Sequence, residues 1–150
     1  MLPASALLAD TISGKLEFTK KPPHAGVLYA VNGGNEMPAA TVDQLNQQFT
    51  PMLIVSKPGE AITFKNSDDV DHNIYANDRK TNVKFDVGLM PPGDSRSQTN
   101  DWPTDSLTRI SCKIHPKMRG YIANISASAF REFEFDRKKK SFDIELLVVP

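Results

Sequence analysis

The stretch Cys112-Lys113-Ile114-His115-Pro116-Lys117-Met118 places a thiol, an imidazole and a thioether in one short segment. A second imidazole, His72, comes far upstream in Asp71-His72-Asn73, at the start of a strand-like run. Side chains three residues apart in a tight loop can converge on one ion, and Pro116 restricts the backbone of that loop. These residues therefore form one candidate metal site.

The types of donor in this group indicate which metal it would hold. Two imidazoles, one thiolate and a distant thioether are the donors of a blue-copper electron-transfer site. Each residue alone has an ordinary explanation, because a Cys packs as a small hydrophobe, a lone His lies at the surface or in the core, and a Met fills gaps. All four at this spacing, in an all-β pattern, favour copper.

Length and composition limit the other functions. The 150 residues suit one domain with its own core. Because 18 Lys and Arg balance 18 Asp and Glu, no global charge indicates nucleic acid or an anionic membrane. The single Cys excludes an intrachain disulfide. The charge runs at 68–71 and 137–140 are interpreted as solvated loop tips.

The first ten residues form a separate segment. Residues 1–9 are apolar and rich in small residues, but they lack a basic n-region, so they are interpreted as a signal-peptide remnant or a disordered N-terminus. A remnant predicts a periplasmic or otherwise exported protein. No apolar run approaches the roughly 18 residues that span a bilayer, so no transmembrane segment is expected.

Short alternating runs separated by turn residues predict an all-β fold, a Greek-key sandwich or barrel. The region 39–49 is ambiguous: Val42, Leu45 and Phe49 keep a helical spacing, whereas its amides, Thr residues and flanking prolines favour an extended connection. The only Trp, Trp102, is interpreted as a packing residue. The expected strands are 11–18, 27–31, 52–56, 61–66, 72–76, 84–88, 95–99, 107–112 and 121–125.

The tail, 129–150, reads as an extra C-terminal β-hairpin around a Lys-rich turn. Phe142, Ile144, Leu146 and Val148 fall on one face of its second arm. The expected organisation is therefore a domain at 11–128 followed by this extension. The hairpin would pack on the domain or serve as a docking or homo-oligomer edge, since an open apolar edge strand promotes aggregation.

The placed motifs carry a resemblance. The sequence resembles the cupredoxins (type 1 blue-copper proteins), in particular short-loop amicyanin- and plastocyanin-like domains of the "methylamine utilisation protein" type. The likeness covers about residues 11–126, and its most specific phrase is Cys112-x-x-His115-Pro116-x-Met118. Two departures are an insertion around 100–106 and a tail at 130–150 that resembles only the first hairpin of a small β-module found in longer relatives. The other matching phrases lie at 49–55, 58–68, 72–75, 84–88 and 119–122.

The resemblance implies roles for these residues. His72, Cys112 and His115 would be the strong equatorial ligands of one type 1 copper, and Met118 the weak axial ligand. Asn73 would tie the two ligand loops together, and Pro116 would stiffen the loop. The expected docking patch for a redox partner, such as a cytochrome or a copper or quinoprotein oxidoreductase, is apolar and comprises Met90, Pro91, Pro92 and the neighbouring pair Met37-Pro38.

Three functions compete. The first is a soluble one-electron carrier that cycles between Cu(I) and Cu(II). The alternative is a periplasmic protein for copper storage, delivery or tolerance, although the chain has no Met- or His-rich tract. A copper enzyme is disfavoured, because a second catalytic centre needs further imidazoles and only His24 remains. His24 is interpreted as a solvated loop residue, with a weak accessory metal site as the alternative.

Overall fold

The computed structural model describes residues 10–31, 37, 39–127 and 129–148, and none of them is in a helix. The all-β expectation is confirmed, and no helix long and apolar enough to span a membrane occurs in this part of the chain. Of the segment 1–10, expected to be a signal-peptide remnant or a disordered N-terminus, residues 1–9 lie outside the described residues, and Asp10 begins a strand. The strands are β1 (Asp10–Glu17), β2 (Ala25–Tyr29), β3 (Thr41–Leu45), β4 (Gln48–Thr50), β5 (Leu53–Ser56), β6 (Ala61–Lys65), β7 (His72–Asp78), β8 (Val83–Met90), β9 (Ser95–Thr99), β10 (Ser106–Ser111), β11 (Arg119–Asn124), β12 (Phe130–Glu134) and β13 (Ser141–Val148).

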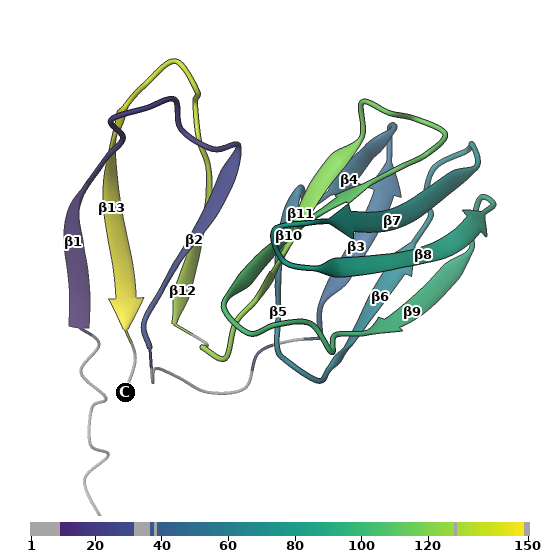
Figure 1. Cartoon of the computed structure of the whole chain (residues 1–150), viewed down its shortest axis with the longest axis horizontal. Coiled ribbons are helices and arrows are strands. Elements are labelled where there is room, and N and C mark those ends of the chain that lie inside the picture. The colour runs from purple at the N-terminus through teal and green to yellow at the C-terminus, as the bar shows by residue number, and fades with distance from the viewer. Residues whose placement is uncertain (1–9, 32–36, 38, 128, 149–150) are drawn as a thin grey trace, which may run out of the picture. The chain divides into compact units, whose positions relative to one another are not determined.

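The chain divides into two compact units (Figure 1). Residues 37–126 form a continuous unit, and the other unit combines segments before residue 37 with segments after residue 126. The domain expected at 11–128 included β1 and β2, whereas the structure groups these strands with β12 and β13. The ambiguous region 39–49 is extended, with β3 and most of β4 in it.

The unit at 37–126 is a two-sheet sandwich. One sheet has the order β5-β11-β10-β7-β8, and the other has the order β4-β3-β6-β9. The pairs β5–β11 and β3–β6 are parallel, and the remaining pairs are antiparallel. Neighbours that are not consecutive in the chain require crossover connections, as Greek-key arrangements have.

Strict alternation along the strands builds the core between these sheets. In β6, Ile62 and Phe64 are fully buried while Ala61 and Lys65 are exposed, because successive side chains of a strand point to opposite faces. Phe64 stacks on the ring of Phe85, and Phe85 stacks on Trp102 with 5.2 Å between ring centroids. Trp102 is therefore a packing residue, as expected.

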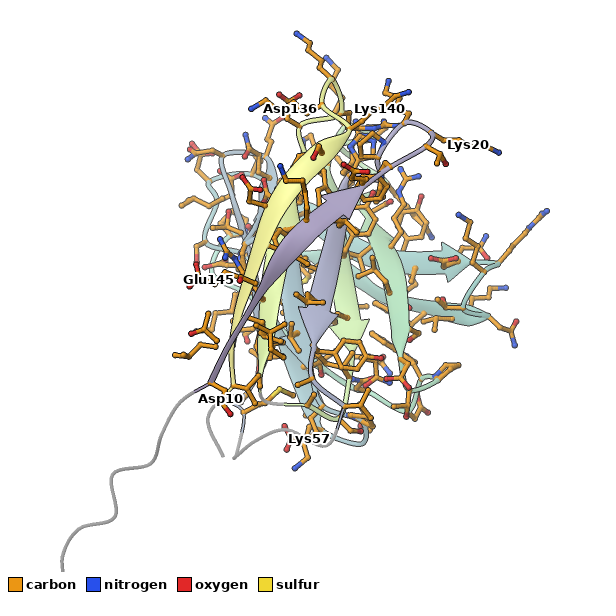
Figure 2. All side chains as sticks on the ribbon, turned by 90° about the vertical axis from the view of Figure 1, so that its left-hand side faces the viewer. Asp10, Lys20, Lys57, Asp136, Lys140 and Glu145 are labelled. Atoms are coloured by element: carbon orange, nitrogen blue, oxygen red, sulfur yellow. The ribbon has the colours of Figure 1, made fainter. Side chains whose placement is uncertain are left out.

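The second unit contains two antiparallel pairs, β1 with β13 and β2 with β12. Figure 2 shows β1 beside β13, with Asp10 near one end of the pair and Lys20 and Lys140 near the other. The two C-terminal strands exist, but they pair with the N-terminal strands and not with each other as the expected hairpin would.

The physical reason for this pairing lies at Phe135, between β12 and β13. Its backbone N–H donates to the carbonyl of His24, which prolongs the pairing of β12 with β2. Its ring is buried against the edges of Phe18 and Phe142, at centroid distances of 5.2 Å and 4.9 Å. Phe135 therefore contacts residues in or next to both strand pairs, β2–β12 through its backbone and β1–β13 through its ring.

Candidate metal centre

The seven-residue stretch 112–118 is the loop that joins the neighbouring strands β10 and β11. It is closed by the pairing of Ser111 with Arg119, so Cys112 directly follows one strand and Met118 directly precedes the next. Within the loop, the N–H of Met118 donates to the carbonyl of His115 over 2.9 Å. Pro116 is exposed and occupies the second position of this turn, where its fixed φ is favourable.

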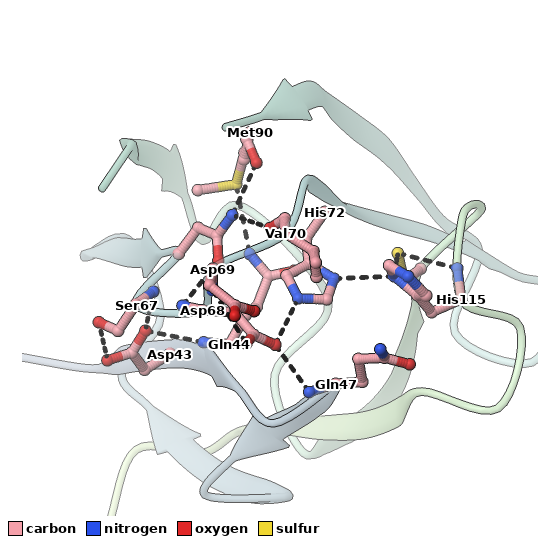
Figure 3. A network of polar contacts seen from close by, with 12 residues as sticks. Asp43, Gln44, Gln47, Ser67, Asp68, Asp69, Val70, His72, Met90 and His115 are labelled. Carbon is pink, nitrogen blue, oxygen red and sulfur yellow. Dashed lines mark hydrogen bonds and ion pairs between the residues drawn. The ribbon is translucent and has the colours of Figure 1, made fainter. Parts of the chain in front are cut away.

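His72 comes from a different part of the chain. It begins β7, which pairs with β10 at Tyr75 and Ser111, so the β-sheet brings His72 close to Cys112. The His72 ring is fully buried. Its Nδ1 atom lies 3.0 Å from Nδ1 of His115, and the two rings meet edge to face (Figure 3).

Three of the four expected ligands converge. Donor atoms of His72, Cys112 and His115 all lie within 4.8 Å of one another. His72 and Cys112 are buried and His115 is half-buried, so the group has one side near the surface. Met118 is 2% exposed and belongs to the same buried cluster as Cys112.

Asp68 is a neighbour of this site that the sequence interpretation missed. Its Oδ2 lies 2.8 Å from Nε2 of His72 and also accepts the N–H of Gln47 over 2.7 Å (Figure 3). The Gln47 N–H, with the His72 ring as a further cause, holds the pKa of Asp68 at about 2. The run at 68–71 was interpreted as a solvated loop tip, and for Asp68 this is wrong, because its side chain is only 9% exposed.

A second polar network joins the two ligand-bearing segments. The Oδ1 atom of Asn73 accepts the N–H of Lys113 over 3.2 Å, and its Nδ2 donates to Oδ1 of Asp86 over 2.7 Å. The Lys113 ammonium bonds to the other carboxylate oxygen of Asp86 and lies 5.4 Å from the centroid of the Tyr75 ring. The Lys113 ammonium is also the main cause that holds the pKa of Asp86 below its ordinary value.

The surface beside the site differs from the expected docking patch. Pro91 and Pro92 are exposed, but Met90 is fully buried, and its sulfur lies 3.6 Å from Nε2 of Gln44. Met90 cannot face a partner, because its position at the end of β8, opposite His72, turns its side chain into the core. The exposed apolar side chains are instead Leu89 (54%) and Ile114 (45%). Of the expected pair Met37-Pro38, Met37 is half-buried and Pro38 lies outside the described residues.

The remaining imidazole, His24, makes a different kind of contact. Its Nε2 atom lies 2.7 Å from Nη1 of Arg137. Because a guanidinium only donates hydrogen bonds, this nitrogen acts as an acceptor there and does not offer its lone pair to a metal ion. The same contact shows that Arg137, in the charge run at 137–140, is not a solvated loop tip.

Comparison with solved structures identifies the fold. A reduced Cu(I) form at pH 4 of an amicyanin mutant aligns with a TM-score of 0.51 and 17% identity, over 69% of this chain and 100% of that one. A Cu-containing nitrite reductase from Thermus scotoductus aligns with a TM-score of 0.51 and 22% identity, over 64% of this chain and 24% of that one. The chain has the cupredoxin fold.

The sequence relationship to a curated protein is partial. The methylamine utilization protein MauL of Methylophilus methylotrophus is 31% identical in an alignment of 94 residues that covers 57% of this chain. The chain therefore spans about half, 51%, of the length of that relative. No protein-family model matches the sequence.

The donor set of this chain, which has the cupredoxin fold, fits copper. A thiolate is a soft ligand that suits Cu(I), and imidazole nitrogen suits copper in general. His72 begins a strand, Cys112 directly follows one, and His115 lies in the short loop between paired strands. The two imidazole nitrogens are 3.0 Å apart, so little rearrangement is needed for these donors to share one ion. His72, Cys112 and His115 are thus close enough to bind a metal ion.

Proposed function

We propose that this cupredoxin is a one-electron carrier with a single type 1 copper, held by His72, Cys112 and His115 and, at longer range, by Met118. The observation that carries this proposal is the convergence of two Nδ1 atoms and one Sγ atom within 4.8 Å. When bound, copper supplies the one-electron redox chemistry. The rest of the function, which is to hold the donors still and to present them to a partner, belongs to the chain.

Rigidity of the ligand set supports electron transfer over other copper chemistry. Fast transfer requires donors that keep their positions in both oxidation states. Cys112 and Met118 are fixed by the last and first residues of paired strands, and Asn73 bonds to the backbone between Cys112 and His115. The fold thus restrains three donors in one loop and joins that loop to the strand that carries His72.

His115 is the proposed exit for the electron, because it is the half-buried ligand of the group. Exposed apolar side chains lie beside it in sequence and beside His72 in the sheet: Ile114, Leu89, Pro91 and Pro92. An apolar surface of this kind suits a brief encounter with a redox protein, because weak complexes bury little area. An exported location is part of the same proposal.

The carrier function is favoured over an enzyme by the environment of His24. A catalytic second centre would need its imidazole as a ligand, yet Nε2 of His24 lies 2.7 Å from the Arg137 guanidinium. The remaining alternative is copper storage or delivery. It differs from the carrier function in one measurable property, because delivery requires that Cu(I) leaves readily.

The test is to load the protein with copper and record visible and electron-spin-resonance spectra. We expect an intense thiolate-to-Cu(II) band that is lost in Cys112→Ser and kept in the neighbouring control Ser111→Ala. The reduced protein should then retain Cu(I) against a moderate chelator and exchange electrons rapidly. A band that survives Cys112→Ser would exclude this ligand assignment, and ready loss of Cu(I) would favour copper delivery.

A further inference from the structure

We propose that Asp68 is a positioning residue that orients His72 toward copper and, through its negative charge, lowers the reduction potential of the site. The inference rests on the proposed copper function, and it names a determinant outside the four ligands. It concerns which nitrogen of His72 has a lone pair for the metal ion and how strongly that lone pair binds.

Burial forces a choice of tautomer on His72. The ring is fully buried, so both of its nitrogens must find partners inside the protein. Nε2 lies 2.8 Å from the carboxylate of Asp68, and a carboxylate can only accept a hydrogen bond. The proton of a neutral His72 is therefore on Nε2, which leaves the lone pair on Nδ1. Nδ1 is the atom that faces His115, 3.0 Å away.

The carboxylate of Asp68 is itself fixed, which distinguishes it from a mobile surface acid. Its Oδ2 accepts the N–H of Gln47 over 2.7 Å, and its Oδ1 accepts the N–H of Asp69 over 3.0 Å. Gln47 and Asn46 have φ values of 53° and 52°, a left-handed turn between β3 and β4 that directs the Gln47 N–H at the carboxylate. The β3–β4 turn thus holds Asp68, and Asp68 holds His72.

The fixed negative charge of Asp68 beside Nε2 makes Nδ1 a stronger electron-pair donor to a metal ion. Carboxylates behind metal-bound imidazoles raise ligand basicity, and their loss typically lowers metal affinity about 10- to 100-fold. Cu(II), the more highly charged ion, gains most from a stronger donor. Removal of the Asp68 charge should therefore weaken the binding of Cu(II) more than the binding of Cu(I). A tenfold loss of affinity for Cu(II) alone corresponds to a rise in reduction potential of about 59 mV for a one-electron couple.

Variants can separate this role from simple loop structure. Asp68→Asn removes the charge but keeps an oxygen that can accept from Nε2, whereas Asp68→Ala removes both the charge and the acceptor. Asp69→Asn is the matched control, because it removes the same charge from the adjacent exposed residue. If Asp68 had a purely structural role, its variants would change in stability, but Asp68→Asn and Asp69→Asn would have the same reduction potential.

The first measurement uses the metal-free wild-type protein and needs no copper. Nitrogen-15 NMR of the imidazoles should show His72 protonated on Nε2, and Asp68→Ala should populate both tautomers. A wild-type His72 that carries its proton on Nδ1 would overturn the inference, even if Asp68→Ala proves too unstable to study.

The second measurement uses the copper-loaded proteins. We expect Asp68→Asn to keep the visible band, to bind Cu(II) about 10- to 100-fold more weakly and to have a raised potential, with Asp69→Asn equal to wild type. Equal reduction potentials in Asp68→Asn and Asp69→Asn would overturn the inference, while the proposed copper function would stand. If the wild type shows no thiolate band, the proposed function fails instead, and the tautomer measurement still decides the orientation of His72.

Discussion

The backbone N–H of His115 points at the sulfur of Cys112, with 3.4 Å between N and Sγ. This contact joins two proposed ligands within a single loop. The turn from His115 to Met118 closes the same loop from the other side. The thiol, the imidazole and the thioether are therefore carried by one compact piece of backbone, whose stiffness should decide how well copper is retained.

Pro116→Gly tests that stiffness. Glycine gives the unfolded chain more freedom, so the free energy of unfolding of the metal-free protein should fall by about 1 kcal/mol in urea titrations. Pro92→Gly, at another exposed proline, should show a similar loss and serves as the control. Only Pro116→Gly should also speed the loss of copper to a chelator. Identical copper retention in the two variants would show that the loop does not need its proline.

Met118→Leu should retain copper but raise the reduction potential, because a weak donor to Cu(II) is removed. Met118 is 2% exposed, and a Leu of similar volume should cost less than about 1.5 kcal/mol of stability. Voltammetry of the variant and the wild type measures the shift. An unchanged potential would mean that Met118 only packs in the core.

Asn73→Ala should destabilise the protein, because it removes the link between the loop 112–118 and the strand that carries His72. It leaves the Lys113 N–H without its acceptor and removes a donor to Asp86, so we expect a loss of about 1–3 kcal/mol. Asn77→Ala, at an exposed position of the same strand β7, is the control and should change stability little. Urea unfolding measures both variants. Equal stabilities would contradict the bridging role of Asn73.

The Asp86–Lys113 pair predicts an acid dependence. The Lys113 ammonium, with smaller contributions from the Gly88 N–H and Asn73, keeps the pKa of Asp86 below its ordinary value of 3.8. A depressed folded-state pKa contributes stability above pH 3.8, and this contribution is lost as the pH falls further toward the folded-state pKa. The stability of Asp86→Asn should therefore differ most from that of the wild type near neutral pH and approach it below pH 3.8. Thermal melts across this range check the trend, and a gap that widens in acid would refute it.

Phe135→Ala should damage one unit and spare the other. The ring is buried against Phe18 and Phe142, and its removal should cost about 3–5 kcal/mol in the unit that contains β1, β2, β12 and β13. All four proposed ligands lie in 37–126, so the copper spectrum should not change. Near-ultraviolet dichroism and the visible spectrum report the two effects separately. A lost visible band would mean that the site depends on both units.

Local patterns in the sequence were enough to predict the sandwich and the proximity of Cys112 and His115 within one loop. Alternation predicted that Ile62 and Phe64 are buried, because a strand in a sandwich has one face in the core. The spacing of Cys112 and His115 predicted their proximity, since a loop between paired strands cannot separate them far. His72 was included because of its donor type and the resemblance to cupredoxins, whereas the pairing of β7 with β10 that brings it to the loop was not predicted.

Long-range contacts explain what the sequence did not reveal. The contact of Asp68 with His72 depends on the Gln47 N–H, and a backbone donor from a distant turn leaves no mark in the residue pattern. The burial of Met90 depends on its register opposite His72, since a shift of one residue would expose it. The pairing of β12 with β2 joins strands far apart in the chain, whereas a sequence pattern favours neighbours in the chain.

The grouping of β1 and β2 with β12 and β13 has a consequence for biosynthesis. The unit that contains the proposed copper ligands, 37–126, is continuous, so all of its strands are available once residue 126 has left the ribosome. The strands β1 and β2 are made before this unit, yet their partners are made after it. Until then they are unpaired edges in a nascent chain, where exposed strands are prone to aggregate. A chaperone that shields the first strands during translation should therefore raise the yield of folded protein more than one added after synthesis is complete.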